Sequence, residues 1–294
     1  MTIEQLMVDS IDMHVHCAPD PFGQWRIDAL QLAQQAREAG MKAVVIKSHY
    51  FGTANLAWMV NRVINNPILV GSLTLDRGAG GMNPDVVEAH IRAGAKVIWM
   101  PTTSAAAHIR DFAREQRNDP FNAGRDVDDG ISIIDKEGKL LPQIERVLEV
   151  IRANKVALAT GHVSIAEVFA IAGEALRQQV NVIVTHPFAR LAGPSLTIEQ
   201  ARQLVSMGAY IEFDFCSCMP PMRQSPADMV NYIKTLGPEH CLLSTDFGQA
   251  RNPPPTEGFR MMLANMLRFD LSEEELSIIV KVNPARLLNL AYDE

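Results

Sequence analysis

Two histidines stand one residue apart in IDMHVH, residues 11–16, near the end of an alternating apolar run. Side chains alternate faces along a β-strand, so Asp12, His14 and His16 would share one face while Met13 and Val15 take the other. Two imidazoles at this spacing can place their nitrogens about 3 Å apart around one cation. The stretch therefore predicts half of a metal site, with Asp12 as the acceptor that fixes one ring. The alternative is a strand face that two histidines share by chance.

Further candidates fall at or just beyond the ends of other apolar runs. They are His49 in IKSHY, His162 in ATGHVS, His186 in VTHPF and Asp246 in LLSTDFG. In a barrel of parallel strands the carboxyl ends converge on one pocket, which would bring these distant residues together. We interpret the remaining histidines as surface or structural groups: His90, His108 and His240.

The apolar runs are typical of a closed barrel. Eight β-branched runs alternate with segments of helical periodicity, and capping boxes at Ser164, Thr197 and Ser272 mark helix starts. The runs are 11–16, 42–48, 68–75, 96–101, 155–161, 180–186, 209–215 and 241–247. Eight such units in 294 residues, with no GxGxxG after the first run, favour an α/β fold of the (β/α)₈ TIM-barrel type over an open doubly wound sheet. We expect one domain, residues 1–294.

One connection is much longer than the others. Residues 102–141 follow the fourth predicted strand and contain a candidate hairpin that turns at Glu137–Gly138. An insertion here would lie on the C-terminal face, where barrel enzymes hold their active sites, so a lid over the substrate is one use. A structural embellishment or a contact in a homo-oligomer is the other.

The pattern of these residues along the chain resembles that of the amidohydrolase superfamily of metal-dependent hydrolases. The resemblance spans the chain: HxH on the first strand, single histidines after the fifth and sixth, an aspartate after the eighth, and a closing NPARLLNL. Because HxH begins at residue 14, we expect the compact branch without a β-sandwich domain. The resemblance implies these metal ligands: His14, His16, His162, His186 and Asp246. It further implies that Asp246 is the general base on the attacking water, and that His162 or His186, for which we favour His186, polarises the transition state.

The chemistry of such a set leads to hydrolysis. Imidazoles and a carboxylate suit Zn²⁺, which lowers the pKa of a bound water to about 7 and polarises a carbonyl or phosphoryl oxygen. Binuclear relatives bridge two metals with a carboxylated lysine or a glutamate after the third or fourth strand, where this chain offers only Asp76. We therefore favour one ion over two. Lys47 and His49 share a face at the second strand, so His49 is a ligand, a substrate contact or a structural residue.

Weaker candidates lie nearby. Glu212 and Asp214 share one strand face and either assist proton transfer or fill a polar barrel layer, which we favour for Glu212. Cys216 and Cys218 are interpreted as small loop residues rather than a soft metal site. Arginines in loops after strands would suit an anionic substrate, although solvated arginines are equally common there: Arg77, Arg125, Arg190, Arg223 and Arg251.

Composition restricts the partners. The net charge of −7 and scattered basic residues give no electrostatic reason to bind nucleic acid or an anionic membrane. No membrane span or signal peptide is predicted, and four cysteines without a CxxC pair fit a reducing compartment. We expect a cytoplasmic protein with a small-molecule substrate. Hydrolysis of a C–N or C–O bond is the leading prediction, and the alternatives are a non-oxidative decarboxylase, a phosphoesterase and a barrel with a structural metal.

Overall fold

The computed structural model describes residues 2–115, 130–189 and 192–291. Eight strands pair in chain order, each parallel to the next. They are β1 (Ile11–Val15), β2 (Ala43–Ile46), β3 (Leu69–Thr74), β4 (Ala95–Trp99), β5 (Ala157–Ala159), β6 (Val182–Val184), β7 (Tyr210–Asp214) and β8 (Cys241–Ser244). Every strand overlaps one of the predicted runs, so the eight predicted strands are confirmed.

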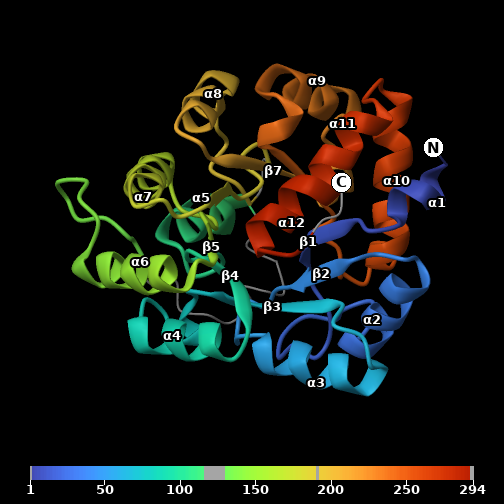
Figure 1. The fold of residues 1–294 in the computed structure, drawn as a ribbon. Coiled ribbons are helices and arrows are strands. Elements are labelled where there is room, and N and C mark those ends of the chain that lie inside the picture. Colours follow the sequence, from blue (N-terminus) through green and yellow to red (C-terminus); the bar gives the residue numbers. More distant parts are fainter. Residues whose placement is uncertain (1, 116–129, 190–191, 292–294) are drawn as a thin grey trace.

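The sheet closes between its first and last strands. Val15 and Phe247 form a parallel bridge. The backbone amide of Asp246 donates to the carbonyl of His14, and that of His16 to the carbonyl of Phe247, both at 2.8 Å. The fold is a (β/α)₈ TIM barrel, as predicted, with the strands at the centre and helices around them (Figure 1).

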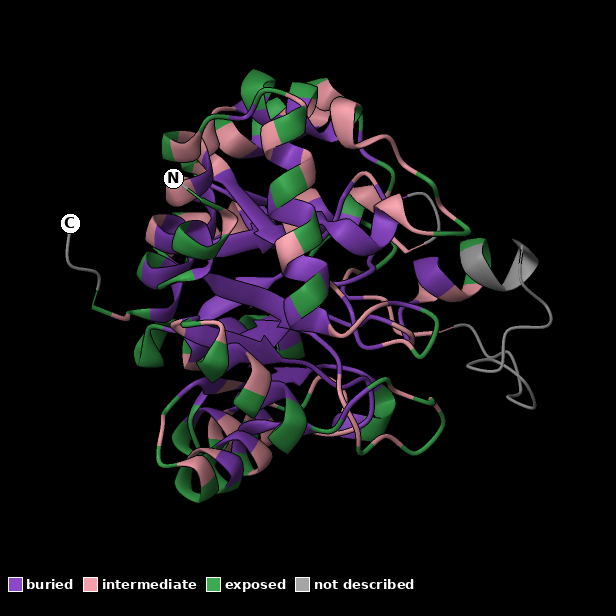
Figure 2. Cartoon of the chain, turned by 90° about the vertical axis from the view of Figure 1, so that its right-hand side faces the viewer, coloured by how far each residue is buried: buried purple, intermediate pink, exposed green. Residues whose placement is uncertain are grey.

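Helices cover the outside of the barrel and one of its ends. They are α1 (Ile3–Met7), α2 (Ala29–Glu38), α3 (Ala54–Ile64), α4 (Pro84–Arg92), α5 (Ala106–Glu115), α6 (Pro142–Asn154), α7 (Ile165–Arg177), α8 (Ile198–Ser206), α9 (Pro226–Leu236), α10 (Pro255–Arg268), α11 (Glu273–Ser277) and α12 (Asn283–Leu288), with short turns η1 (Arg77–Ala79), η2 (Phe215–Cys218), η3 (Pro238–His240) and π-helical η4 (Ile278–Val282). The predicted capping boxes at Ser164, Thr197 and Ser272 are confirmed. Figure 2 shows buried strands enclosed by helices with exposed outer faces. Among the helices of the described residues, none has the length and apolarity to cross a bilayer.

The core has two parts. The larger cluster joins the outer faces of the strands to the helices, and Val15 belongs to it. The smaller cluster joins residues of seven strands, such as Met13 and Trp99, to Leu287 and Leu288 of α12. We conclude that α12 closes the N-terminal end of the barrel, which leaves the C-terminal end for polar side chains. The strict alternation predicted for 11–16 is wrong at Met13, because the pairing of β1 with β2 shifts register between Asp12 and Val15.

The insertion after β4 is tied to the barrel on both sides of α5. Ala105 pairs with Ile131, and Glu167 of α7 accepts hydrogen bonds from the Ser132 hydroxyl and the Ile133 amide, both at 2.8 Å. The predicted hairpin turn is confirmed: Ile134 and Leu140 form an antiparallel bridge around Glu137–Gly138. Residues 116–129 lie outside the described residues, so the use of 102–141 as a lid stays a prediction.

Candidate metal centre

Three predicted ligands converge at the C-terminal end of the barrel. Oδ1 of Asp246 lies 3.2 Å from Nε2 of His14 and 3.1 Å from Nε2 of His16. One ligand atom from each residue lies within 4.8 Å of the other two. Both histidines are buried and Asp246 is partly buried. Two imidazole nitrogens and a carboxylate oxygen at this separation fit the three protein ligands of an open zinc site.

The local backbone explains how β1 and the loop after β8 meet. Asp246 has a positive φ of 51°, a conformation that aspartate tolerates better than most residues. Gly248 follows with a φ of 151°, and a Cβ there would lie 2.2 Å from the carbonyl oxygen of His16. Only glycine lets the loop pass so close to the strand. The short sequence TDFG therefore places the carboxylate against the two rings.

His162 and His186 lie beside this group. The His186 ring stacks on that of His14 with centroids 5.7 Å apart, and the centroids of His162 and His186 are 5.0 Å apart. Nε2 of His162 and Nδ1 of His186 are buried and have no hydrogen-bond partner among the described residues. Within the described part of the chain, neither belongs to the three-residue cluster itself. Their unpartnered nitrogens nevertheless suit a cation or a substrate next to it.

Two sharp turns hold these histidines in place. Gly161 has a φ of 62°, and a Cβ there would lie 2.3 Å from the carbonyl oxygen of Met100, so glycine is required just before His162. His186 has a φ of 24°, which is strained for a side chain of its size. Such strain concentrates at functional sites, where surrounding structure maintains it.

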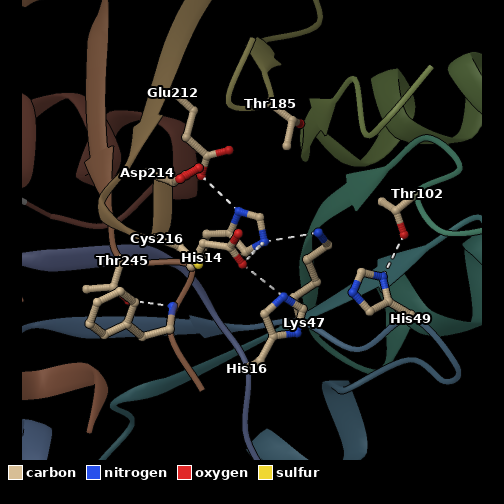
Figure 3. A network of polar contacts seen from close by, with 12 residues as sticks. His14, His16, Lys47, His49, Thr102, Thr185, Glu212, Asp214, Cys216 and Thr245 are labelled. Carbon is tan, nitrogen blue, oxygen red and sulfur yellow. Dashed lines mark hydrogen bonds and ion pairs between the residues drawn. The ribbon is translucent and has the colours of Figure 1, made fainter. Parts of the chain in front are cut away.

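The residue that orients His14 is Glu212. Its Oε1 lies 3.2 Å from Nδ1 of His14 (Figure 3), whereas the other ring nitrogen, Nε2, faces Asp246. A carboxylate on the second nitrogen fixes the tautomer of a ligating histidine and makes it a better donor to a metal. We predicted only that Glu212 fills a polar layer of the barrel. Its contact with Nδ1 of His14 goes beyond that prediction.

Asp12 does not occupy the position predicted for it. Its carboxylate accepts hydrogen bonds from the amide (3.0 Å) and hydroxyl (2.6 Å) of Thr245 and from the backbone amide of His14 (3.3 Å). This corrects the prediction of a contact with a histidine ring, and the irregular register of β1 is the reason. Asp12 therefore joins β1 to the end of β8. Burial raises its pKa to about 7.

Lys47, at the end of β2, lies inside the site. Its Nζ is 3.0 Å from Nε2 of His14 and 5.4 Å from the ring centroid of Trp99. Burial lowers its pKa, although the surrounding carboxylates oppose this effect. The amino group of Lys47 therefore contacts Nε2 of His14, the same nitrogen that faces Asp246.

His49 and Asp76 meet at the hydroxyl of Thr102. Nδ1 of His49 is 2.7 Å from the Thr102 hydroxyl and 3.7 Å from Oδ2 of Asp76. Asp76 accepts hydrogen bonds from the Thr102 hydroxyl and from the amides of Thr102 (2.9 Å) and Ser104 (2.8 Å). The carboxylate near the third strand therefore anchors the start of the insertion.

Burial disfavours the charged form of two imidazoles of the site. It lowers the pKa of His16 to about 3 and that of His186 to about 4. Neutral imidazole is the form that binds a metal. Burial alone would raise the pKa of Asp246, but His14 and His16 hold it well below its ordinary value, so this carboxylate is ionised.

Comparisons with known proteins agree with the fold. A family model described as "Family of unknown function (DUF6282)" matches residues 9–212. The chain belongs to this family. A search of curated proteins gives no match.

Solved structures similar to this DUF6282 chain include amidohydrolases. One is an amidohydrolase from Pseudomonas aeruginosa, with a TM-score of 0.64, 10% identity and 98% of both chains covered. Another is a probable 2-pyrone-4,6-dicarboxylic acid hydrolase from Acinetobacter baumannii with citric acid bound (0.61, 11% identity, 96% of this chain and 100% of that one). A third is an amidohydrolase from Burkholderia multivorans with bound zinc (TM-score 0.59, 12% identity, 96% of this chain and 99% of that one covered). The predicted resemblance to amidohydrolases is confirmed for the fold.

Further predicted residues of this family member are arginines and cysteines. Arg223 and Arg251 are exposed on loops after β7 and β8, and Arg190 lies outside the described residues. Burial raises the pKa of the Cys216 thiol well above its ordinary value and that of Cys218 to about 12. Both thiols are therefore protonated, which agrees with their interpretation as loop residues.

One residue that lies beside the site was not predicted there. His108, interpreted as a surface or structural group, is buried on α5, with its Nδ1 only 3.0 Å from Nδ1 of His162. Candidate ligands were predicted at the ends of strands, whereas His108 lies on helix α5 inside the insertion. Its apolar neighbourhood in TTSAAAHI was the one signal that this part of the insertion packs inward.

Proposed function

We propose that this protein is a metal-dependent hydrolase that cleaves a C–N or C–O bond of a small anionic molecule. The observation that carries the proposal is the convergence of His14 Nε2, His16 Nε2 and Asp246 Oδ1 at the carboxyl end of the barrel. This is the end of a TIM barrel at which active sites are built. One zinc ion is our proposal for the metal, supported by the imidazole-rich donor set and by the zinc in the Burkholderia multivorans protein of the same fold.

Each residue has a distinct task in this proposal. When bound, the ion would acidify a water molecule and polarise the bond to be cleaved. His14 and His16 would hold it, and Glu212 keeps the lone pair of His14 directed at the site. Asp246 would take the proton of the attacking water on the oxygen that does not face the two rings. His186, stacked beside His14, would stabilise the charge that develops on the substrate.

Cationic side chains support an anionic substrate. Lys47 lies within the site, and Arg223 and Arg251 lie on loops that follow β7 and β8. The Acinetobacter baumannii relative in fold is described as a hydrolase of a dicarboxylic acid and holds citric acid. We therefore propose a substrate with one or more carboxylates, attached to a lactone, ester or amide.

A substrate screen tests this function. Zinc-loaded protein and protein treated with a chelator are assayed against lactones, esters and amides that carry carboxylates, with parallel assays for release of CO₂ and of phosphate. We expect hydrolysis of at least one carboxylated compound by the loaded protein only. Release of CO₂ without hydrolysis would replace the proposal with a decarboxylase, and release of phosphate without cleavage of any lactone, ester or amide would replace it with a phosphoesterase. Equal activity after chelation would contradict a metal-dependent reaction.

A further inference from the structure

A helix of the insertion reaches the site. His108 lies in the first turn of α5 and is only 8% exposed. Its Nδ1 lies 3.0 Å from Nδ1 of His162, and the two ring centroids are 4.9 Å apart. His162 follows β5, so this contact joins the insertion to a candidate ligand on the barrel. The superfamily resemblance assigns no task to a histidine at this place.

The start of α5 is held firmly enough to position a side chain. Just before it, Asp76 accepts hydrogen bonds from the amides of Thr102 and Ser104 at 2.9 and 2.8 Å. The Ala106 amide then donates to the carbonyl of Ile131 at 2.9 Å, and the Ile131 amide to that of Ser104 at 2.7 Å. Hydrogen bonds to the barrel and within the insertion therefore fix the backbone that carries His108.

The hydrogen bond has a preferred direction. With two Nδ1 atoms 3.0 Å apart, one ring must donate and the other accept. If His108 donated, the proton of neutral His162 would sit on Nε2, which is buried and has no hydrogen-bond partner among the described residues. A buried donor without an acceptor is unfavourable. If His162 donates, its Nε2 keeps a lone pair, next to the ring of His186.

We propose that His108 is a positioning residue: it accepts the Nδ1 proton of His162 and thereby directs the Nε2 lone pair of His162 at the metal centre. Metal-binding histidines commonly donate their second N–H to such a partner. The inference rests on the proposed function, because it assumes a metal at the centre. With this role for His108, helix α5 contributes a residue to the site.

Three substitutions test this assignment. His108→Asn keeps an oxygen at the position of Nδ1 that can accept the proton of His162, His108→Leu removes the acceptor, and His108→Gln is polar but carries its oxygen one bond farther out. His240→Leu, at the opposite end of the barrel before β8, is the matched control. Zinc affinity is measured by competition with a chelator, and folding by thermal denaturation in excess chelator. The visible spectrum of the cobalt-substituted protein gives a second readout of the ligand geometry.

We expect the leucine and glutamine variants to bind zinc about 10- to 100-fold more weakly, while the asparagine variant and His240→Leu stay near wild type. The cobalt spectrum should change in the same two variants. Wild-type affinity in His108→Leu and His108→Gln would overturn the inference, as would an asparagine variant as weak as the leucine variant. If the wild-type protein itself binds no zinc, the proposed function fails, which is a different result from these.

Discussion

Replacing Asp246 with asparagine should lower the turnover of zinc-saturated protein by about 10²- to 10⁴-fold, the range for loss of a general base. The amide keeps the shape of the side chain but cannot take a proton from water. His14 and His16 remain to hold the metal, so the variant should still bind zinc at a raised concentration. The measurement is kcat with the substrate found in the screen, at zinc concentrations that saturate each protein.

Asp228→Asn is the control for this substitution, because Asp228 is exposed on α9. It should leave kcat unchanged. If Asp246→Asn held metal and kept full activity, the assignment of Asp246 as general base would be wrong, and a barrel with a structural metal would become the better account.

Zinc should stabilise the folded protein strongly. Glu212 and Asp214 both lie on β7 (Figure 3), and burial together with the charges of Asp246 and Glu212 raises the pKa of Asp214 to about 7. A bound cation relieves this repulsion. A ligand at 1,000 times its Kd contributes about 4 kcal/mol, which in a protein of this size raises the midpoint of thermal unfolding by roughly 5–10 °C.

The measurement compares thermal unfolding of protein saturated with zinc and protein stripped by a chelator. A double variant, His14→Asn with His16→Asn, serves as the control and should show no difference between the two conditions. An equal shift in wild type and double variant would place the stabilising zinc elsewhere in the molecule and contradict the site.

The barrel was predictable because its strands are short, apolar and regularly spaced, and because chemistry in this fold gathers where strands end. Asp246 and the pair His14 and His16 could be found in this way, since their positions depend on strand ends alone. The contacts between side chains could not be predicted from the sequence. Glu212 reaches His14 across the barrel, and Asp12 turns to Thr245 because of a register shift that no periodicity reveals.

His108 shows a second limit of sequence reasoning. Its place depends on how the insertion returns to the barrel, through backbone hydrogen bonds between Ser104, Ala106 and Ile131. Backbone hydrogen bonds carry no residue preference that could be read in advance, because every residue type offers the same carbonyl. A helix histidine in a long connection therefore has the sequence signature of a surface residue, although its ring is buried against His162.

Metal analysis of the purified protein tests the central claim most directly. Protein produced with zinc in the medium and then dialysed should contain about one equivalent of zinc, as expected for a site with three protein ligands and an open position. The double variant His14→Asn with His16→Asn, purified alongside it, should contain almost none. Zinc well below half an equivalent in the wild type, or equal zinc in both proteins, would contradict a metal centre at His14, His16 and Asp246.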